Sequence, residues 1–332
     1  MTPPFLELVD LASERLGAEV VAANDDFFAP KESLIKSDAP VWIEGKYTDH
    51  GKWMDGWETR RRREPGHDWC IVRLAAPGRV RGVDVDTAFF KGNHPEACAI
   101  DACRLDEAST DPERAEWREI LPRTVLQGDA HNVLPVEEST IATHLRLRIF
   151  PDGGVARLRV YGEVVFDWSR VAAAGEADLA AVEHGGLVVA ASDMFFGSRH
   201  NLIMPGDARY MGDGWETRRR RGPGHDWTIV RLGAPGRVSR IQVDTRHFKG
   251  NAPGSCSLEG CAALEWQTAD WRELLPQAPL QPDRVHEFVD AIQSIGEALY
   301  VRLNIFPDGG VARLRLFGRA TTNIVKAAES AG

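Results

Sequence analysis

The chain has 332 residues, of which 43% are hydrophobic and 27% are charged, and its formal net charge at pH 7 is −9. These proportions are ordinary for a soluble globular protein, and no apolar run approaches the roughly 20 residues that cross a bilayer. The negative charge argues against a protein that binds nucleic acid, because phosphate binding needs a basic face.

The N-terminal segment lacks the pattern of a secretory signal. Residues 1–11 contain Glu7 and Asp10, and they have neither a basic start nor a long apolar stretch. We therefore expect a cytoplasmic protein with no membrane partner. The cysteines lack the C-x-x-C spacing of a zinc ribbon and suit small buried side chains in a reducing compartment. They are Cys70, Cys98, Cys103, Cys256 and Cys261.

The segment 55–69, DGWETRRRREPGHDW, is the first strong motif along the chain, and fourteen of its fifteen positions return at 213–227. The offset is 158 residues, and APGRV, VDT and FKGN recur at the same offset. WREILP recurs as WRELLP after 154 residues, IFPDGGVARLR recurs after 156, and DDFFA resembles DMFFG after 168. These changes of offset fall between motifs, as insertions in loops would produce. The sequence therefore predicts two repeats, residues 1–168 and 169–332.

Within each repeat, apolar and polar residues alternate as they do in β-strands. Residues 145–149 (LRLRI) alternate in this way, PDGG at 151–154 is a strong turn signal, and the alternation resumes at 156–161. Further strands are predicted at 69–74, 80–85 and 99–105. The pattern predicts an all-β fold of two tandem β-sandwich or jelly-roll repeats. One short helix is predicted at the join between the repeats, over 176–183.

The motif WETRRRR at 57–63 concentrates positive charge in an acidic chain. If it forms a strand, successive side chains of Arg60–Arg63 point to opposite faces. Arginine is costly to bury without a partner, and its planar fork fits a carboxylate with two parallel hydrogen bonds. We therefore predict a clamp for a substrate carboxylate. The alternatives are an ion-paired strand, with Glu58 and Asp68 as partners, and a solvated edge.

Two neighbouring loops carry further polar residues. GHDW at 66–69 places a histidine beside an aspartate, and histidine exchanges protons near neutral pH, where a carboxylate raises its basicity. The alternative is a turn in which Asp68 bonds the backbone and His67 is solvated. Lys91 and Asn93 follow in a Gly-bearing loop, where they either donate hydrogen bonds to a substrate or belong to an ordinary loop.

Together these motifs resemble the repeat of the allantoicase family. The resemblance rests on GKWMDGWETRRRR at 51–63 and on GHDW, VDT with FKGN, and PDGGVARLR in both halves, and it covers nearly the whole chain. It implies two jelly-roll repeats of the galactose-binding-like kind and a homo-oligomer. It also implies a hydrolase of purine (allantoin) catabolism that splits allantoate into ureidoglycolate and urea. The alternative is a non-catalytic pair of modules that binds a small molecule or glycan.

Splitting allantoate needs a grip on its carboxylate, a proton for the departing ureido nitrogen, and a base for water or for the remaining ureido N–H. The glutamates are candidate bases and the histidines candidate acids. The candidate catalytic residues are Glu58, His67 and Asp68 in the first repeat and Glu216, His225 and Asp226 in the second. The candidate substrate-binding residues are Arg60, Arg61, Arg62, Arg63, Lys91 and Asn93, with Arg218, Arg219, Arg220, Arg221, Lys249 and Asn251. No cofactor is required by the sequence. The resemblance leaves manganese possible, and a metal site can be assembled from His50, His67, Asp68 and His94.

The surroundings of the two motifs differ. His50 aligns with Ala208, Glu64 with Gly222, His94 with Ala252 and Glu96 with Gly254. Each difference removes a polar or titratable side chain from the second copy. We therefore predict that the first repeat is the better equipped for catalysis. Two equal sites, or one site shared by the repeats, are the alternatives.

Overall fold

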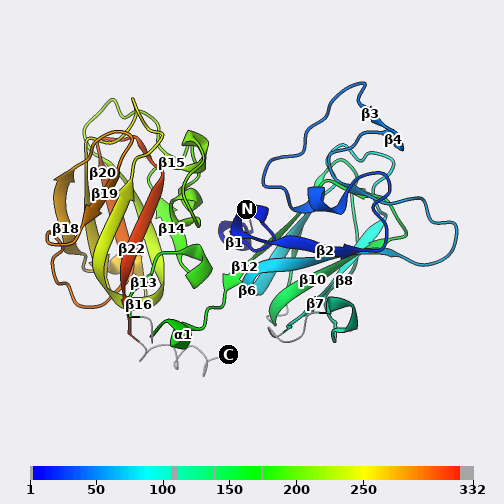
Figure 1. Ribbon diagram of the computed structural model, residues 1–332, viewed down its shortest axis with the longest axis horizontal. Helices are drawn as coiled ribbons and strands as arrows, with labels where there is room; N and C mark the ends of the chain where they lie inside the picture. Colours follow the sequence, from blue (N-terminus) through cyan, green and yellow to red (C-terminus); the bar gives the residue numbers. More distant parts are fainter. Residues whose placement is uncertain (1–2, 106–110, 138–139, 173–174, 322–332) are drawn as a thin grey trace. The chain divides into compact units, whose positions relative to one another are not determined.

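The computed structural model describes residues 3–105, 111–137, 140–172 and 175–321. The chain forms two compact units, residues 1–165 and 166–332, and strands dominate both (Figure 1). The prediction of an all-β chain with two tandem sandwich repeats is confirmed. No helix among the described residues is long and apolar enough to cross a membrane.

The first unit contains twelve described strands and four short 3₁₀ helices. The strands are β1 (Val9–Asp10), β2 (Glu19–Ala23), β3 (Tyr47–Thr48), β4 (Gly51–Lys52), β5 (Trp57–Glu58), β6 (Asp68–Asp86), β7 (Ala97–Cys103), β8 (Arg118–Val125), β9 (His131–Pro135), β10 (Ile141–Phe150), β11 (Gly154–Val155) and β12 (Arg157–Val164). The 3₁₀ helices are η1 (Pro4–Glu7), η2 (Glu14–Leu16), η3 (Lys31–Ile35) and η4 (Pro112–Arg114).

The second unit repeats this order without the hairpin of β3 and β4. Its strands are β13 (Ala177–Asp178), β14 (Leu187–Ala191), β15 (Trp215–Glu216), β16 (Asp226–Asp244), β17 (Ser255–Cys261), β18 (Arg272–Pro279), β19 (Val285–Phe288), β20 (Ala298–Phe306), β21 (Gly310–Val311) and β22 (Arg313–Ala320). Its helices are α1 (Trp168–Ala172), η5 (Val182–His184), η6 (Arg199–Ile203), η7 (Met211–Asp213) and η8 (Trp266–Thr268).

The long strand β6 links the two layers of the first sandwich. Its first part pairs antiparallel with β2 and β10, and β10 continues through β7 to β8. Its last part pairs with β12 and β9, and β12 continues to β1. The segments 69–74 and 80–85, which the sequence predicts as separate strands, are therefore two parts of one strand. In the second unit β16 pairs in the same way with β14, β20, β22 and β19.

The alternating strands supply the core between the layers. Leu145, Leu147 and Ile149 of β10 are fully buried, as are Leu158 and Val160 of β12. The arginines between them lie on the outer faces, because successive side chains of a strand point to opposite sides. All five cysteines are buried and unpaired, as predicted from their spacing.

The prediction of a helix over 176–183 is wrong. The segment contains the strand β13 and the start of η5, and the described α-helix of this region, α1, lies further upstream. The Asp178 side chain explains the difference, because it accepts hydrogen bonds from the amides of Ala180 and Leu316 and so ties the segment to β22. A tertiary contact has overridden the local helix propensity.

A buried ion pair ties the segment between β4 and β5 to β12. Arg157 Nη2 lies 2.8 Å from Asp55 Oδ2, and both side chains are buried. Arg157 also donates to the carbonyl oxygens of Asp38, Asp55 and Ala156. Burial is the largest single influence on Asp55 and opposes its ionisation. The hydrogen bonds from Arg157 and the amide of Val41, together with the charges of Arg157 and Lys36, outweigh it, so the pKa of Asp55 lies below its usual value.

Removing one partner of a buried pair leaves the other charge uncompensated. We therefore expect Asp55→Ala to lower the free energy of unfolding of the first unit by about 3–5 kcal/mol. The matched control is Asp49→Ala at an exposed position, which should change it by less than about 0.5 kcal/mol. Urea unfolding at neutral pH measures both. Equal effects of the two substitutions would show that the buried pair is not a main stabilising contact.

Candidate active site

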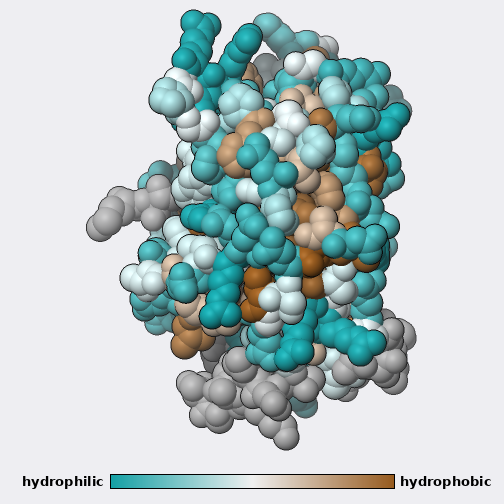
Figure 2. Space-filling view, turned by 90° about the vertical axis from the view of Figure 1, so that its left-hand side faces the viewer, coloured by the Kyte–Doolittle hydropathy of each residue, from teal (hydrophilic) through white to brown (hydrophobic). Residues whose placement is uncertain are grey.

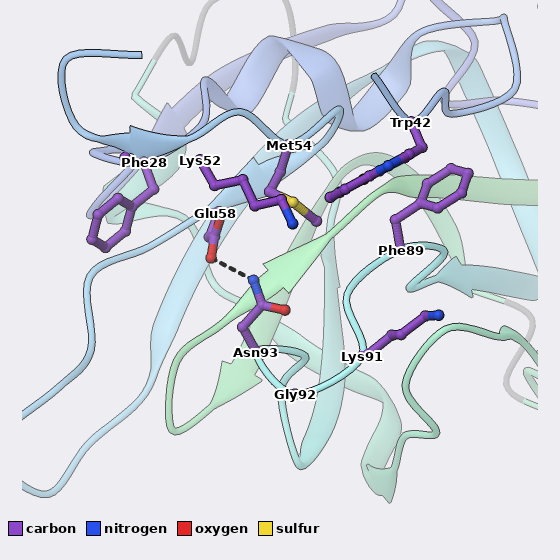
Figure 3. A pocket seen from close by; sticks show the side chains of 10 residues that line it. Phe28, Trp42, Lys52, Met54, Glu58, Phe89, Lys91, Gly92 and Asn93 are labelled. Atoms are coloured by element: carbon purple, nitrogen blue, oxygen red, sulfur yellow. Dashed lines mark hydrogen bonds between the residues drawn. The ribbon is translucent and has the colours of Figure 1, made fainter. Parts of the chain in front are cut away.

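The first unit contains a pocket of about 660 Å³ at one end of its sandwich (Figure 3). It lies between the loop after η3, the strand β5 and the loop after β6. Its lining residues are Phe28, Trp42, Gly51, Lys52, Met54, Glu58, Phe89, Lys91, Gly92 and Asn93. Three residues predicted from the sequence, Glu58, Lys91 and Asn93, are therefore brought together.

Glu58 is held at the pocket by its neighbours on β5. The preceding Trp57 is fully buried, and its indole Nε1 donates to the carbonyl oxygen of Asp25 at 2.8 Å. Asn93 Nδ2 donates to Glu58 Oε1 at 2.7 Å, as the dashed line in Figure 3 marks. Burial raises the pKa of Glu58, and the hydrogen bond from Asn93 opposes this rise. The result is a half-buried, oriented carboxylate whose proton affinity is higher than that of an ordinary glutamate.

The loop after β6 presents the FKGN motif to the pocket through an unusual backbone. Phe89 has a φ of +69°, which is uncommon for an aromatic residue. Its amide donates to Asp129 Oδ1 at 2.7 Å, which fixes the turn. The next residue, Phe90, is fully buried against Gly154 of the PDGG turn, where a Cβ atom would lie 1.9 Å from the ring. This tight contact between Phe90 and Gly154 explains why the FKGN and PDGG motifs occur together in each repeat.

Aromatic and cationic side chains form the remaining wall. Lys52 Nζ lies 4.1 Å from the centroid of the Trp42 ring, and the rings of Trp42 and Phe89 are 6.1 Å apart. Lys91 Nζ lies 3.7 Å from Asp129 Oδ2, and its side chain is mostly exposed at the rim. The pocket therefore combines an apolar wall with one carboxylate, one amide and two ammonium groups. Such a set suits a small polar anion.

An insertion in the first repeat contributes to one side of this pocket. Asp55 Oδ2 accepts from the amide of Val41, and Asp213 Oδ2 accepts in the same way from Arg209. Val41 and Arg209 are 168 positions apart, whereas the two aspartates are 158 apart. The first repeat thus has ten extra residues, 43–52. They include the hairpin of β3 and β4 and two of the lining residues.

This register corrects the alignment made from the sequence. His50 lies inside the insertion and has no counterpart, and Ala208 corresponds instead to Pro40. In the second unit the chain passes directly from Tyr210 to Met211, and Asn251 Nδ2 lies 3.4 Å from Met211 Sδ. Asn251 also donates to Glu216, so the second repeat keeps the paired glutamate and asparagine without the inserted wall.

The four arginines do not form a strand, because β5 ends at Glu58. They occupy a loop, and none of them lines the pocket. Arg60 Nε lies 2.6 Å from Asp25 Oδ2 and Arg62 Nη1 lies 2.7 Å from Asp68 Oδ1, while Arg61 and Arg63 are exposed. The alternative of an ion-paired segment therefore describes Arg62 and Asp68, but not the predicted partner Glu58.

The second run of arginines is arranged similarly. Arg218 Nε lies 3.1 Å from Asp193 Oδ2, and Arg220 is paired with the buried Asp226. Arg219 is exposed. Lys249 Nζ lies 3.8 Å from Asp283 Oδ2, as the corresponding Lys91 lies near Asp129 in the first repeat. Arg221 lies in the same loop, outside any strand.

The histidines of the GHDW loops lie outside the pocket lining. The ring of His67 is 5.2 Å from that of Phe150, and burial, followed by the charges of Arg148, Arg146 and Arg62, lowers its pKa. His225 Nε2 lies 3.3 Å from Asn304 Oδ1 in the second repeat. Its ring centroid is 4.6 Å from that of Phe306.

The candidate metal ligands are not assembled. Among the described residues, no three His, Cys, Asp or Glu side chains are grouped so that they could hold a metal ion. The ring of His50 packs on Phe27, and His94 Nδ1 lies 3.1 Å from the carbonyl oxygen of Lys91. The pocket itself offers the single carboxylate of Glu58. These donors do not fit a manganese site formed by protein ligands alone.

Sequence reasoning missed the inserted side of the pocket. Trp42, Lys52, Met54 and Phe89 belong to no doubled motif, so a search for repeats does not select them. The available signal was the change of offset from 168 to 158 between neighbouring motifs, which marks the insertion. Loops inserted into a rigid scaffold often carry function.

The fold and the pocket define a two-repeat β-sandwich protein with a pocket of small-molecule size in its first repeat. The family model of the allantoicase repeat matches residues 9–165 and 177–321. The chain is 51% identical over 322 residues to a probable allantoicase of Pseudomonas aeruginosa (strain UCBPP-PA14), covering 95% of this chain and 97% of that one. It is 49% identical over 321 residues to a probable allantoicase of Photobacterium profundum, with 95% and 97% covered.

A solved structure agrees with these sequence matches. The crystal structure of allantoicase from Saccharomyces cerevisiae superimposes with a TM-score of 0.80 at 36% identity, over 93% of this chain and 92% of that one. The chain therefore belongs to the allantoicase family.

Proposed function

We propose that this protein hydrolyses allantoate to ureidoglycolate and urea, and that the pocket of the first repeat is its active site. Membership of the family supports the reaction. The assignment of the active site to this pocket rests on Glu58, which is half-buried, is oriented by Asn93 and lines the pocket together with Lys52.

The chemistry sets the requirements for the site. The central carbon of allantoate carries one carboxylate and two ureido groups. One bond from this carbon to a ureido nitrogen breaks, and the oxygen of water becomes bonded to the carbon. One proton must reach the departing nitrogen, and one must leave water or the remaining ureido N–H. A single group that first accepts and then donates a proton satisfies both needs.

Glu58 is that group in our proposal. Its raised pKa makes it a better proton acceptor than an ordinary carboxylate, and the protonated form can return the proton to the departing nitrogen. Asn93 fixes one oxygen of the carboxylate and leaves the other for the substrate. Trp42, Phe89 and Phe28 shield the reaction from bulk water.

The substrate carboxylate needs cations, and we assign this role to Lys52 and Lys91. Both line the pocket, whereas Arg60 and Arg62 are engaged by aspartates outside it. We derive no step through a metal, because the residues at the site do not supply a ligand set for one.

Urea release tests the proposed function directly. We expect the purified protein to release one urea for each allantoate consumed and to leave the ring of allantoin closed. The assay is run after dialysis against EDTA and again with added manganese. Inactivity under both conditions would favour a module that only binds small molecules.

The pH profile tests the role of Glu58. A general base acts in its ionised form, so kcat/KM should fall as the pH drops through the raised pKa of Glu58. The acidic limb should therefore lie above the usual value for glutamate, about 4.3. In Asn93→Ala the limb should move to still higher pH, because the hydrogen bond that favours the ionised form is lost. A limb at the ordinary value, unmoved in that variant, would exclude Glu58 as the base.

We further infer that the protein acts in the cytoplasm as a homo-oligomer. Its unpaired cysteines suit a reducing compartment. One side of the second unit shows hydrophobic side chains among hydrophilic ones (Figure 2), and Phe195, Phe196 and Tyr210 of this unit are exposed. Exposed apolar side chains of this size favour association. Light scattering would measure the molar mass, and a strictly monomeric value would contradict the inference.

A further inference from the structure

A second cavity of the first repeat, of about 400 Å³, lies between β6, β9 and β12. Asp84, Asp86 and His131 line it together with Arg157 and Arg159. The corresponding cavity of the second repeat measures only about 40 Å³. The difference between the two copies shows what such a cavity can hold.

In the second repeat an arginine of the chain fills this place. Arg246 Nη1 and Nη2 lie 3.0 and 2.6 Å from the two carboxylate oxygens of Asp207. Arg246 Nε and Nη2 lie 2.9 and 2.7 Å from Asp244 Oδ2. In the first repeat Ala88 stands in place of Arg246, and Ala39 stands in place of Asp207. The guanidinium group is therefore missing, while Asp244, Arg313 and Arg315 are kept as Asp86, Arg157 and Arg159.

The first repeat keeps two carboxylates at the vacated place. Asp86 corresponds to Asp244, and it accepts from the amide of Ala88 at 2.8 Å, as Asp244 does from the amide of Arg246. Asp84 replaces Gln242 and is only 7% exposed, yet its Oδ1 has no hydrogen-bond partner among the described residues. A buried carboxylate oxygen without a partner is costly, and a bound donor would satisfy it.

His131 compensates this charge only in part. Its Nδ1 lies 2.8 Å from Asp84 Oδ2 and 4.0 Å from Asp86 Oδ2, and its side chain is largely exposed. The counterpart of His131 is Val285. When His131 is neutral, the lining of the first cavity has two carboxylates and two arginines, whereas that of the second has two carboxylates and three arginines. The first cavity thus lacks one positive charge when His131 is neutral. The hydrogen bond to Asp84 raises the pKa of His131, so this difference appears at alkaline pH.

The two remaining arginines do not prevent a cation from binding. Arg157 is held by Asp55, and Arg159 donates to the carbonyl oxygen of Ser37. Their counterparts Arg313 and Arg315 border the second cavity, which nevertheless holds a third arginine. The second repeat shows that a guanidinium group can lie beside this pair of arginines when two carboxylates, Asp207 and Asp244, accept its hydrogen bonds.

We propose that the cavity of the first repeat is a binding site for a guanidinium group supplied from outside the chain. Asp86 takes one side of the planar fork, as Asp244 does for Arg246, and Asp84 takes the place of Asp207. The ligand is either a small guanidinium compound or an arginine side chain of a second copy of this chain. The site is distinct from that of Glu58, although Phe89 borders both cavities, and it does not depend on the proposed reaction.

Calorimetric titration of the intact protein with methylguanidinium, at constant ionic strength and pH 8, tests the proposal. We expect saturable binding of one equivalent, and none of methylurea, which has a similar shape without the charge. Ala88→Arg should abolish binding, because its side chain fills the cavity as Arg246 does. Asp84→Asn should weaken binding about tenfold or more, since hydrogen bonds to charged groups are the strong ones.

The second repeat supplies the matched control. Arg246→Ala should open a second site, so that two equivalents of methylguanidinium bind. No saturable binding to the unmodified protein, or undiminished binding to Ala88→Arg, would overturn the proposal. Light scattering distinguishes the two sources of the ligand. If an arginine of a second copy is the natural occupant, adding methylguanidinium and introducing Ala88→Arg should each lower the molar mass. If the natural ligand is a small compound, neither change should alter the molar mass.

Discussion

Replacing Glu58 by Gln is expected to lower kcat for urea release by about 10²–10⁴-fold, the usual contribution of a general acid or base. The substitution keeps the size of the side chain and removes the charge that accepts a proton. Asn93 can still donate to the remaining carbonyl oxygen, so the pocket should keep its shape. KM should change little by comparison, because the lost interaction belongs to the chemical step.

The matched control is Glu216→Gln in the second repeat. This glutamate also has an asparagine partner, but the wall formed by residues 43–52 has no counterpart beside it. We therefore expect kcat to stay near the unmodified value. Equal, partial losses from the two substitutions would indicate two independent sites. Near-complete loss from either one alone would indicate a site shared by both repeats. Circular dichroism of each variant confirms that the fold is intact.

The sequence predicts the fold well because the fold depends on its repeated features. Alternation in LRLRI places Leu145 and Leu147 in the core, and the PDGG turn recurs where the structure has one. The sequence predicts two strands, at 69–74 and 80–85, where the structure has the single strand β6. The bulge there lets one strand serve both layers, and local sequence does not reveal pairing partners.

The site was predicted less completely, for a different reason. Glu58, Lys91 and Asn93 lie in doubled motifs, and the structure brings them to one pocket. The charge of the arginine run predicts a carboxylate clamp, yet Arg62 pairs with the buried Asp68 within the protein. Charge density alone does not separate a ligand-binding arginine from one that is already paired inside the protein.

The differences between the repeats carry information that their similarities do not. Identical motifs include contacts that both sandwiches need for folding, such as the Phe90 ring packed against Gly154, so identity alone does not mark a site. The insertion at 43–52 and the exchange of Arg246 for Ala88 occur in one repeat only, and each coincides with a cavity. An internal duplication thus provides its own comparison, in which the second copy shows the same fold without the insertion and with an arginine in the second cavity.

Deleting residues 43–52 should abolish most activity while the fold survives. The deletion joins Trp42 to Trp53, and the second repeat makes the same connection between Tyr210 and Met211. The buried pair of Asp55 and Arg157 lies outside the deleted segment, so the loop remains anchored. We expect kcat/KM to fall by about 10²-fold or more, since a hydrogen bond to a charged group contributes about 1.5–3 kcal/mol and the pocket also loses its cover.

Two variants within the intact loop separate the causes of that loss. Lys52→Met removes the ammonium group but keeps the hairpin. It should reproduce a large part of the fall in kcat/KM, mainly by raising KM, because the ammonium group binds the substrate carboxylate both before and during the reaction. His50→Ala changes a hairpin residue that does not line the pocket, and it should leave the kinetics unaltered. Steady-state rates of urea release measure all three variants. If the deletion variant folds and retains full activity, the inserted loop is not part of the active site, and the catalytic pocket must be sought elsewhere in the molecule.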